Sequence, residues 1–472
     1  MGLPRTGIGI RTRSCSGSGN ICGDGDVSAM IRTGYLLLIA LLLTGCGASD
    51  NSGSGAGQQT QVWLPVGGAA TVEWQASLGF LQFIPGLPLE ELAQVSRGRE
   101  LFVADWEMAP GARPQLDGLG PLFVAGACDL CHTANGRAAS LLADGQVGSG
   151  LLFRLGDASG QPDPHLGGQL QPFATVGRGE GDVSWQDDGS GKPQFVLSNP
   201  THALAAGIHL GPRLSPQLTG VGLLNLVPEE QILAYEDESD SNADGISGRA
   251  HRLQREGQDC IGRFGWKAMQ CSLRGQSAGA LQQDMGLTSV VNPQEPCTEH
   301  QDICASQPSG GNPEVSAEAL GQINEFLSVL AVYERRVSDN AAFERGAQLF
   351  AQTGCAACHR PTLTTRTDAA LEPLRGQTIY AYTDLLLHDM GADLSDGVGE
   401  GNAQPQEWRT PPLWGLGLLE NDGVSRFLHD GRAQTLPQAI LWHGGEGLAA
   451  KQAFEQLSQQ QRDDLLSFLR AI

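Results

Sequence analysis

The sequence has little positive charge, few aromatic side chains and only one long apolar run. Its 472 residues include 30 Lys and Arg against 52 Asp and Glu, for a net charge of −22. Such a charge repels a polyanion, so we exclude nucleic acid as a partner and expect a donor protein with a basic face to be attracted. Aromatic residues make up 6% of the chain, beside 64 Gly and 25 Pro. This composition predicts many loops and short helices.

The one long apolar run, residues 35–43, follows a short basic segment at residues 30–34. This order is typical of a secretory signal, and the run is too short to cross a membrane in the mature protein. It ends in L-T-G-C at Cys46, which resembles a bacterial lipobox. We therefore expect translation to start at Met30, and lipidation at Cys46 to anchor the exported protein in the bacterial cell envelope, facing the periplasm. A plain signal peptide is the alternative.

Two stretches of the chain carry the same C-x-x-C-H motif, and a Leu-Phe pair stands five residues before each first cysteine. The motif residues are Cys128, Cys131 and His132 in the first copy, and Cys355, Cys358 and His359 in the second. This motif attaches a c-type haem, because two thiols on one turn bond the two vinyl groups while the adjacent imidazole binds the iron. We predict two covalently bound c-type haems. A zinc knuckle or a redox dithiol is the alternative reading of a single copy.

Of the eleven cysteines, three lie in the leader and four in the motifs, which leaves Cys260, Cys271, Cys297 and Cys304. An even number in an exported protein favours two disulfides, for which three pairings are possible. We predict that nearest neighbours pair, as Cys260–Cys271 and Cys297–Cys304. A metal site is the alternative, although no histidine lies at convincing ligand spacing among them.

The two motifs divide the chain into two parts with the same plan. The expected segments are a leader and signal peptide at 1–46, a flexible tether at 47–61, a first domain at 62–337 and a second domain at 338–472. In each domain a candidate helix precedes the motif, and apolar spacing predicts a closing helix at 317–333 or 460–472. We therefore predict a mainly α, loop-rich fold of two cytochrome c-like domains, the first with a long insertion.

An acidic turn lies in the first domain. Asp240, Asn242, Asp244 and Gly245 match the first half of a calcium loop, but His251 stands where the bidentate Glu of an EF-hand belongs. The turn is therefore not an EF-hand. An irregular calcium site and a solvated acidic turn remain open.

Residues after the second motif could complete a haem site. Met390 can fold back as the sixth iron ligand, which would raise the potential and close the haem to exogenous ligands. His388 is a rival ligand, and a core role for Met390 is the alternative. Arg409 and Arg432 are candidates to pair with haem propionates, because buried carboxylates need cationic partners. Either arginine could instead form an ordinary surface salt bridge.

Several stretches resemble the bacterial di-haem oxidoreductase family, which is named for peroxidase or thiol oxidoreductase activity and is related to the di-haem cytochrome c peroxidases. They are G-L-G-P-L-F at 118–123, L-T-G-V-G-L-L-N-L-V-P at 218–228, R-F-G-W-K-A at 263–268, and the later L-H-D-M-G, R-T-P-P-L and H-D-G-R. The resemblance implies an electron-relay haem, a reactive haem open to peroxide, a calcium ion between the domains and a tryptophan between the haems. Trp266 is the candidate tryptophan. No residue matches the distal glutamate of the true peroxidases.

The expected function is that of a peroxidase-like oxidoreductase. We expect the haem on Cys128 and Cys131 to be reactive, because the long loop-rich insertion follows it and loops on a rigid scaffold often build substrate pockets. The haem on Cys355 and Cys358 would feed it electrons. Polar groups of the insertion are the catalytic candidates, namely Gln169, Gln171, Glu180 and His209.

The expected partners are an electron donor and a small oxidant such as hydrogen peroxide. The donor would be a cytochrome, a cupredoxin or a quinol-linked protein. Two alternatives remain. One is a pure electron-transfer di-haem cytochrome, and the other is a di-haem oxidase of a protein, a thiol or an organic substrate.

Overall fold

The computed structural model describes residues 65–472. The predicted signal peptide, the predicted lipidation site Cys46 and the predicted tether lie outside the described residues. Within residues 65–472, no helix is both long and apolar enough to cross a membrane.

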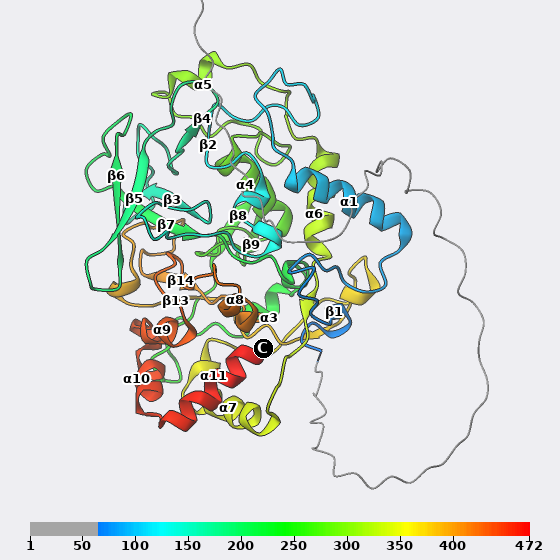
Figure 1. Cartoon of the computed structure of the whole chain (residues 1–472), viewed down its shortest axis with the longest axis vertical. Helices are drawn as coiled ribbons and strands as arrows, with labels where there is room; N and C mark the ends of the chain where they lie inside the picture. Colours follow the sequence, from blue (N-terminus) through cyan, green and yellow to red (C-terminus); the bar gives the residue numbers. More distant parts are fainter. Residues whose placement is uncertain (1–64) are drawn as a thin grey trace, which may run out of the picture. The chain divides into compact units, whose positions relative to one another are not determined.

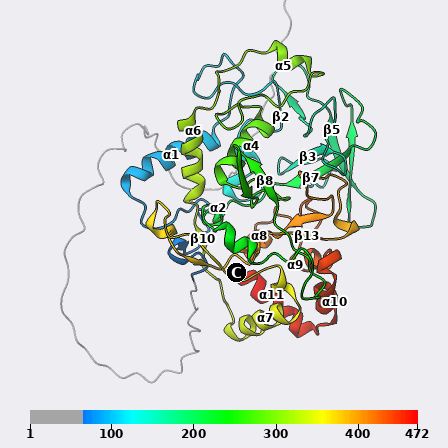
Figure 2. The same cartoon turned by 180° about the vertical axis from the view of Figure 1, so that it is seen from behind.

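Two packed helix pairs carry the repeated plan seen in the sequence. Helix α1 (Leu89–Val103) packs against α6 (Ala317–Ser328), and α7 (Asn340–Gln352) packs against α11 (Gln459–Ala471) (Figures 1 and 2). In each pair a glycine lies at the contact. A Cβ on Gly98 would lie 1.9 Å from the carbonyl oxygen of Gln322, and one on Gly346 would lie 2.2 Å from that of Asp464. The close approach of the helices therefore depends on glycine in both pairs.

The first closing helix ends at Ser328, not at residue 333 as the apolar spacing predicted. The next residues form β10 (Val332–Tyr333), which pairs in parallel with β1 (Thr71–Val72). Both residues of β10 are buried. The apolar residues after Ser328 are therefore buried in a strand and not in a longer helix, which is why the apolar spacing placed the end of the helix too late.

The prediction of a mainly α, cytochrome c-like fold is wrong, because only 30% of the structure is helical while 17% is strand. All sheets in residues 65–472 are two-stranded. The long antiparallel pairs are β3 (Leu151–Gly156) with β7 (His209–Leu214), β5 (Asp182–Asp187) with β6 (Pro193–Ser198), and β8 (Arg252–Arg255) with β9 (Gln258–Ile261). These pairs fill the insertion, where turn residues and not helical spacing decide the structure. Glu256 and Gly257, for example, both have positive φ in the two-residue turn between β8 and β9.

The remaining elements are short. The other strands are β2 (Leu122–Phe123), β4 (Phe173–Ala174), β11 (Leu363–Thr364), β12 (Thr378–Ile379), β13 (Leu387–Asp389) and β14 (Glu407–Arg409). The other α-helices are α2 (Val221–Asn225), α3 (Glu229–Leu233), α4 (Leu273–Met285), α5 (Asp302–Ser306), α8 (Leu416–Asn421), α9 (Leu436–Leu441) and α10 (Leu448–Gln456). The 3₁₀ turns are η1 (Gly68–Ala70), η2 (Cys128–Leu130), η3 (Thr133–Asn135), η4 (Cys355–Ala357), η5 (Glu372–Leu374), η6 (Ala392–Leu394) and η7 (Gly445–Gly447). The loop-rich character is as expected from the Gly and Pro content.

Each helix pair belongs to its own apolar core. Phe102 of α1 and Phe326 of α6 lie in the first core, and Cys128 packs against it. Phe350 and Phe468 lie in the second core, and Cys355 packs against that one. Each predicted haem motif is thus positioned by its own helix pair. The predicted domain boundary at residue 337 falls between β10 and α7 and stays a prediction.

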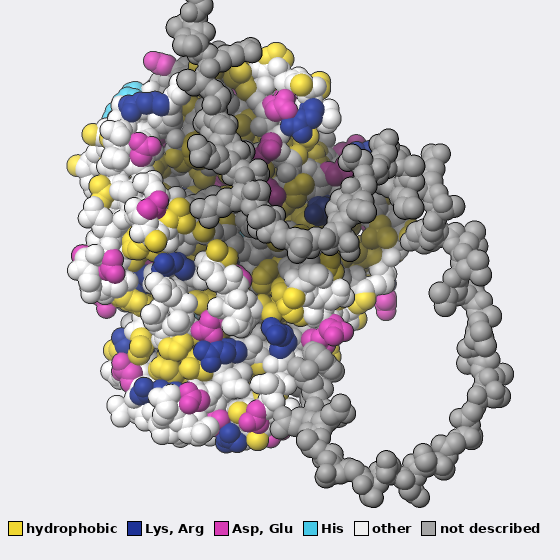
Figure 3. All heavy atoms as spheres, viewed as in Figure 1, with side chains coloured by type: hydrophobic (Ala, Val, Ile, Leu, Met, Phe, Trp, Pro, Cys, Tyr) yellow, Lys and Arg dark blue, Asp and Glu magenta, His cyan; other side chains and the backbone are white. Residues whose placement is uncertain are grey.

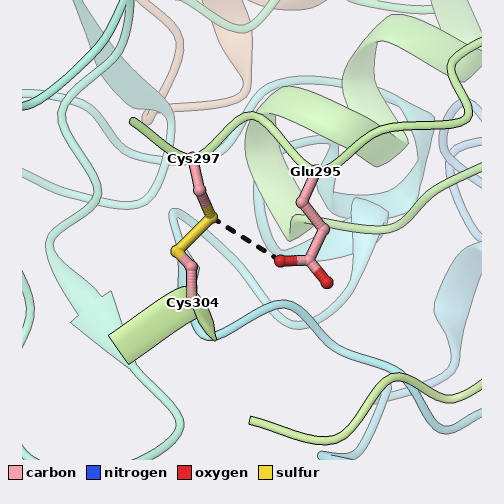
Figure 4. A group of neighbouring side chains, drawn as sticks. All are labelled: Glu295, Cys297 and Cys304. Carbon is pink, nitrogen blue, oxygen red and sulfur yellow. Dashed lines mark hydrogen bonds between the residues drawn. A yellow bond between two sulfur atoms is a disulfide. The ribbon is translucent and has the colours of Figure 1, made fainter. Parts of the chain in front are cut away.

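Both predicted disulfides are present, as Cys260–Cys271 and Cys297–Cys304. The first joins β9 to the residue before the N-cap of α4. Figure 4 shows the second, with the Glu295 carboxylate close to Cys297. Because the four sulfurs are bonded to one another in pairs, they are not thiolate ligands, and the alternative of a metal site is wrong.

Candidate haem sites

The thiols of each motif lie on a 3₁₀ turn and form no disulfide. Backbone bonds from His132 N to Cys128 O (3.1 Å) and from His359 N to Cys355 O (3.0 Å) close the two turns. Burial raises the pKa of Cys128 and Cys131 to about 12, and nearby carboxylates add to this effect. Thiols with such a pKa stay protonated near pH 7, which does not suit a reactive redox dithiol. Thioether attachment of a haem at the first motif stays a prediction.

The two motif histidines are held in the same way. Nδ1 of His132 lies 2.8 Å from the carbonyl oxygen of Pro216, and Nδ1 of His359 lies 3.0 Å from that of Tyr382. Nδ1 therefore donates in both rings, and Nε2 of each is free of hydrogen bonds to the described residues. Burial lowers the pKa of both to about 4, so both are neutral near pH 7. A neutral imidazole oriented through Nδ1 is a ready iron ligand through Nε2.

Two arginines, the buried Arg409 and the partly buried Arg137, form no salt bridge with a carboxylate among the described residues. Arg409 donates to the carbonyl oxygens of Gly265 (2.9 Å) and Thr410 (3.0 Å), and Arg137 donates to that of Arg426. Burial lowers the pKa of each guanidinium to about 10. A buried cation of this kind needs an anion, and a haem propionate would supply one.

Arg432, the other predicted propionate partner, differs from Arg409. Its Nη2 lies 2.8 Å from Oδ2 of Asp430, and both side chains are buried. Its charge is therefore already compensated within the loop. Sequence reasoning missed Arg137, because nothing in its local sequence distinguishes it from a surface arginine.

The free thiol pairs, the neutral histidines and the uncompensated arginines all fit two haems. The cysteines and histidines of the two motifs would hold the haems, and Arg137 and Arg409 would pair with the haem propionates. The fit rests on chemical complementarity at both motifs.

His388 lies beside the second motif but is tied to two carboxylates. Its Nε2 is 2.9 Å from Oδ2 of Asp384, and its Nδ1 is 2.7 Å from Oε2 of Glu446. Burial opposes the charge, but the Asp384 carboxylate outweighs it and holds the pKa of His388 well above its usual value. Both ring nitrogens of His388 are thus engaged by carboxylates in this structure. Its role as a rival ligand stays a prediction.

Met390 and His443 approach the same point near the second motif. A Cβ on Gly447 would lie 3.1 Å from Cε of Met390 and 3.2 Å from Cδ2 of His443. Nδ1 of His443 is 2.9 Å from the carbonyl oxygen of Ala439, which leaves Nε2 free, as in the motif histidines. The Met390 assignment stays a prediction. His443, which sequence reasoning missed, is a second possible ligand at the same place.

A partly buried carboxyl lies beside the first motif. Asp284, near the end of α4, accepts a 2.9 Å hydrogen bond at Oδ1 from Nε2 of Gln169. After burial, its negative charge is the largest contribution that raises the pKa of Cys128 and of Cys131. Burial also raises the pKa of Asp284 itself. Sequence reasoning missed this residue, since only the tertiary fold brings the end of α4 to the first motif.

Three of the four predicted catalytic residues gather at the end of α4. Nε2 of Gln169 and Nε2 of Gln171 each donate to the carbonyl oxygen of Gln283 at 2.8 Å. Glu180 accepts from the backbone N–H of Gln171 (2.7 Å) and from Nε2 of Gln301 (2.5 Å). Burial raises the pKa of Glu180 to about 7.

His209, the fourth candidate, lies apart from this cluster. It is exposed at the start of β7, and a Cβ on Gly397 would lie 2.6 Å from its ring. Its role as a catalytic residue stays a prediction that the geometry does not favour.

Trp266 donates from Nε1 to the carbonyl oxygen of Leu214 at 2.7 Å, and its ring lies edge-on to His429 with centroids 6.4 Å apart. Its carbonyl oxygen accepts from Arg409 N at 2.8 Å. The backbone at Trp266 therefore links the insertion to the segment after the second motif. Its predicted place between two haems stays a prediction.

The acidic turn is stabilised by its own hydrogen bonds. The backbone N–H of Asp244 donates to Oδ1 of Asp240 (3.0 Å) and Oδ1 of Asn242 (2.9 Å). Asn242 and Asp244 are exposed. Calcium binding at this turn stays a prediction.

Paired thiols, each beside a neutral oriented histidine, define the class of haem-binding redox proteins. A family model described as "Di-haem oxidoreductase, putative peroxidase" matches residues 63–146 and 196–472. The chain belongs to this family. Gln169, Gln171 and Glu180 fall between the two matched ranges, whereas Asp284 lies within the second.

No curated protein matches the chain. Among solved structures, hydrazine synthase of Kuenenia stuttgartiensis is similar with a TM-score of 0.36 and 14% identity, covering 90% of this chain and 100% of that chain.

Proposed function

We propose that this di-haem oxidoreductase is an exported, lipid-anchored peroxidase with both haems attached through thioether bonds. Its reactive centre is at Cys128 and Cys131, and its electron relay is at Cys355 and Cys358. The observation that carries this proposal is the asymmetry of the carboxyl groups. Asp284 beside the first motif has no cationic partner within salt-bridge distance in residues 65–472, whereas Asp384 and Glu446 beside the second are both bonded to His388.

A protonatable carboxyl at the first motif is what peroxide reduction requires. Reduction of hydrogen peroxide to two waters consumes two electrons and two protons, so a group must move a proton at the reacting oxygens. A haem bound at this motif would provide an iron that binds peroxide and transfers electrons to it. Burial raises the pKa of Asp284, so this carboxyl binds a proton more readily than an exposed aspartate does. Gln169 fixes Oδ1, while Oδ2 has no hydrogen bond to a described residue.

The second site fits a relay. Its polar groups are paired with one another, and Met390 and His443 stand close together as possible sixth ligands. A fixed sixth ligand keeps peroxide away from a haem and favours simple electron transfer. Electrons would enter from a donor protein with a basic face, drawn by the net charge of −22.

Replacement of His132 and His359 by Gly, one at a time, tests this assignment. Peroxide consumption by the haem-loaded protein is measured with an artificial one-electron donor, and a high-spin ferric signal is followed by EPR. The His132 variant should lose turnover under all conditions, whereas a small reductant should restore turnover in the His359 variant. The opposite rescue would reverse the roles. Two low-spin haems without peroxide turnover in the parent protein would establish the pure electron-transfer cytochrome instead.

A further inference from the structure

A cavity of about 660 Å³ lies on the side of α4 that carries Gly275, Gly279 and Gln283. The β8–β9 hairpin, the end of β3 and the loop at residues 398–401 form its other walls. This volume is within the usual range for sites that bind small molecules, about 300–1,000 Å³. The Cys260–Cys271 disulfide lies in the wall and joins the hairpin to α4, so the two walls are held together covalently.

Three arginines line the cavity, and two of them have no carboxylate within salt-bridge distance among the described residues. Arg274 is paired with Glu256 at 3.5 Å. Among residues 65–472, the Arg255 side chain donates to the carbonyl oxygens of Gln254 (3.1 Å) and Met269 (2.9 Å) and to no carboxylate. The guanidinium of Arg154 forms no hydrogen bond with any residue in 65–472. In a chain with 30 basic and 52 acidic residues, unpaired arginines around one cavity point to an anionic ligand.

The one other carboxylate in the wall offsets part of this charge. Glu400 is bonded to Arg213, with Nη2 2.6 Å from Oε1, but Arg213 lies outside the wall and is shared with Asp396. Three arginines of the wall therefore stand against two carboxylates, Glu256 and Glu400, and the lining keeps a net positive charge.

The rest of the wall suits an organic ligand better than an inorganic anion. Met269, Val291 and Val398 provide apolar surface in the same wall. Amide side chains provide further donors and acceptors, and these are Gln258, Gln270, Gln282, Gln283 and Asn292. A carboxylate would bind the arginines, while a short carbon body would contact the apolar side chains.

The inner wall adjoins the first haem motif. Gln283 lines the cavity, and the next residue of α4 is Asp284. The carbonyl oxygen of Gln283 accepts from the same Gln169 amide that holds Asp284. Arg154 is close enough to Asp284 to oppose the effect of burial on the pKa of that carboxyl. The cavity and the first motif therefore share the end of α4.

We propose that this cavity is a binding site for a small organic carboxylate, held by Arg154 and Arg255, and that this carboxylate is oxidised at the first site. In that reaction the carboxylate would give up two electrons and two protons, and these would reduce one hydrogen peroxide to two waters. The role as a substrate rests on the proposed peroxidase function, whereas the binding of a carboxylate does not. The anion site and the haem motif are separate, since no residue of either C-x-x-C-H lines the cavity.

Calorimetric titration of the haem-loaded protein with acetate, succinate and benzoate tests the binding, with benzamide as the neutral match for benzoate. At least one carboxylate should bind, and benzamide should bind at least about tenfold more weakly than benzoate where benzoate binds. Arg154→Gln and Arg255→Gln should each weaken the carboxylate about tenfold or more. Arg178→Gln is the matched control, because Arg178 is an exposed arginine of the insertion outside the cavity.

Three outcomes separate the parts of this proposal. If none of the carboxylates binds, or if Arg178→Gln weakens binding as much as Arg154→Gln, the anion site is refuted. If a carboxylate binds through the arginines but does not change peroxide turnover, the site stands and its role as a substrate site is refuted. If the parent protein consumes no peroxide at all, the proposed function fails while the binding result still decides the anion site.

Discussion

At the scale of single residues, Asp284 and Glu180 are both carboxyls with a raised pKa, but Glu180 is buried, Asp284 is partly buried, and their partners differ. Both oxygens of Glu180 accept a hydrogen bond, from Gln171 N and from Gln301. Within residues 65–472, the Asp284 carboxyl accepts a hydrogen bond at Oδ1 and none at Oδ2. A carboxyl with one free oxygen can pass a proton to a neighbouring molecule, whereas a fully bonded one serves the fold.

Asp284→Asn should therefore lower peroxide turnover about 100-fold or more, the usual contribution of a general acid–base. Glu180→Gln is the matched control and should stay within about threefold of the parent enzyme, since it keeps a polar group between Gln171 and Gln301. Steady-state peroxide consumption with an artificial donor measures both. Equal losses in the two variants would remove Asp284 from its proposed role.

Asp284→Asn should lower turnover but raise stability at high pH. Burial raises the pKa of Asp284 in the folded state above its unfolded value, so the folded protein binds this proton more tightly. Its contribution to the free energy of unfolding is then largest below the unfolded pKa and falls as pH rises through the folded pKa. The thermal midpoint of Asp284→Asn minus that of the parent should therefore be more positive at pH 8 than at pH 4. A thermal midpoint that falls equally at both pH values would contradict a buried ionisable carboxyl.

Met390 and His443 can be distinguished by spectroscopy. Met390→Ala should abolish the sulfur-to-iron charge-transfer band at the red edge of the oxidised spectrum and lower the potential of the second haem. His443→Ala should leave both unchanged. An unaltered spectrum in Met390→Ala together with a new high-spin signal in His443→Ala would instead assign the ligand to His443.

At the scale of elements, the two helix pairs depend on glycine where the helices touch. Gly346 of α7 faces the carbonyl oxygen of Asp464 in α11, and Gly98 of α1 faces that of Gln322 in α6. A methyl group at either position would meet backbone that cannot move aside. The helix pairs must therefore separate or bend to accept a side chain.

Gly346→Ala should lower the free energy of unfolding by about 1–3 kcal/mol, the usual cost of overpacking. Gly321→Ala is the control within a helix, because a Cβ on Gly321 of α6 has no atom within 4 Å. That change should stabilise the protein by up to about 1 kcal/mol through helix propensity. Urea unfolding of the haem-loaded proteins measures both, and a harmless Gly346→Ala would show that the pair is not closely packed at this point.

At the scale of the whole molecule, acidic side chains outnumber basic ones, although both kinds occur on the surface. Figure 3 shows Asp and Glu side chains interspersed with Lys and Arg on one face. The acidic excess of the chain, with a net charge of −22, acts at long range. This net negative charge should therefore attract a basic donor protein even where acidic side chains are not gathered into one patch.

The rate of reduction by a basic cytochrome should fall about tenfold or more when ionic strength rises from about 0.01 M to about 0.5 M. A neutral reductant such as hydroquinone serves as the control, and its rate should change little. Stopped-flow absorption of the second haem measures both. A rate that does not depend on salt with the basic cytochrome would exclude long-range attraction.

The expected anchor is also a property of the whole molecule. Cys46→Ala should move the protein from the membrane fraction to the soluble periplasmic fraction, because the lipid would no longer be attached. Immunoblots of fractionated cells measure this. A variant that stays in the membrane fraction would show that Cys46 is not the anchor.

Local covalent chemistry and local spacing were readable from the sequence by itself. The C-x-x-C-H motifs, the disulfides closing short loops at Cys260–Cys271 and Cys297–Cys304, and most of the closing helix at α11 each depend on residues close in the chain. The family resemblance rested on such short stretches and is confirmed by the match over residues 63–146 and 196–472. Properties that arise within one or two turns of backbone can be predicted without the fold.

Only the tertiary structure decided the fold class and the surroundings of the two motifs. The mainly α prediction failed because the flanking helices have clear periodicity, while the hairpins of the insertion are set by turns and by pairing between distant strands. Asp284, Arg137 and His443 are unremarkable in their local sequence. Their altered pKa values come from burial, and burial exists only once distant segments have packed together. The cavity at Arg154 and Arg255 arises in the same way, from walls that are far apart in the chain and adjacent only in the folded protein.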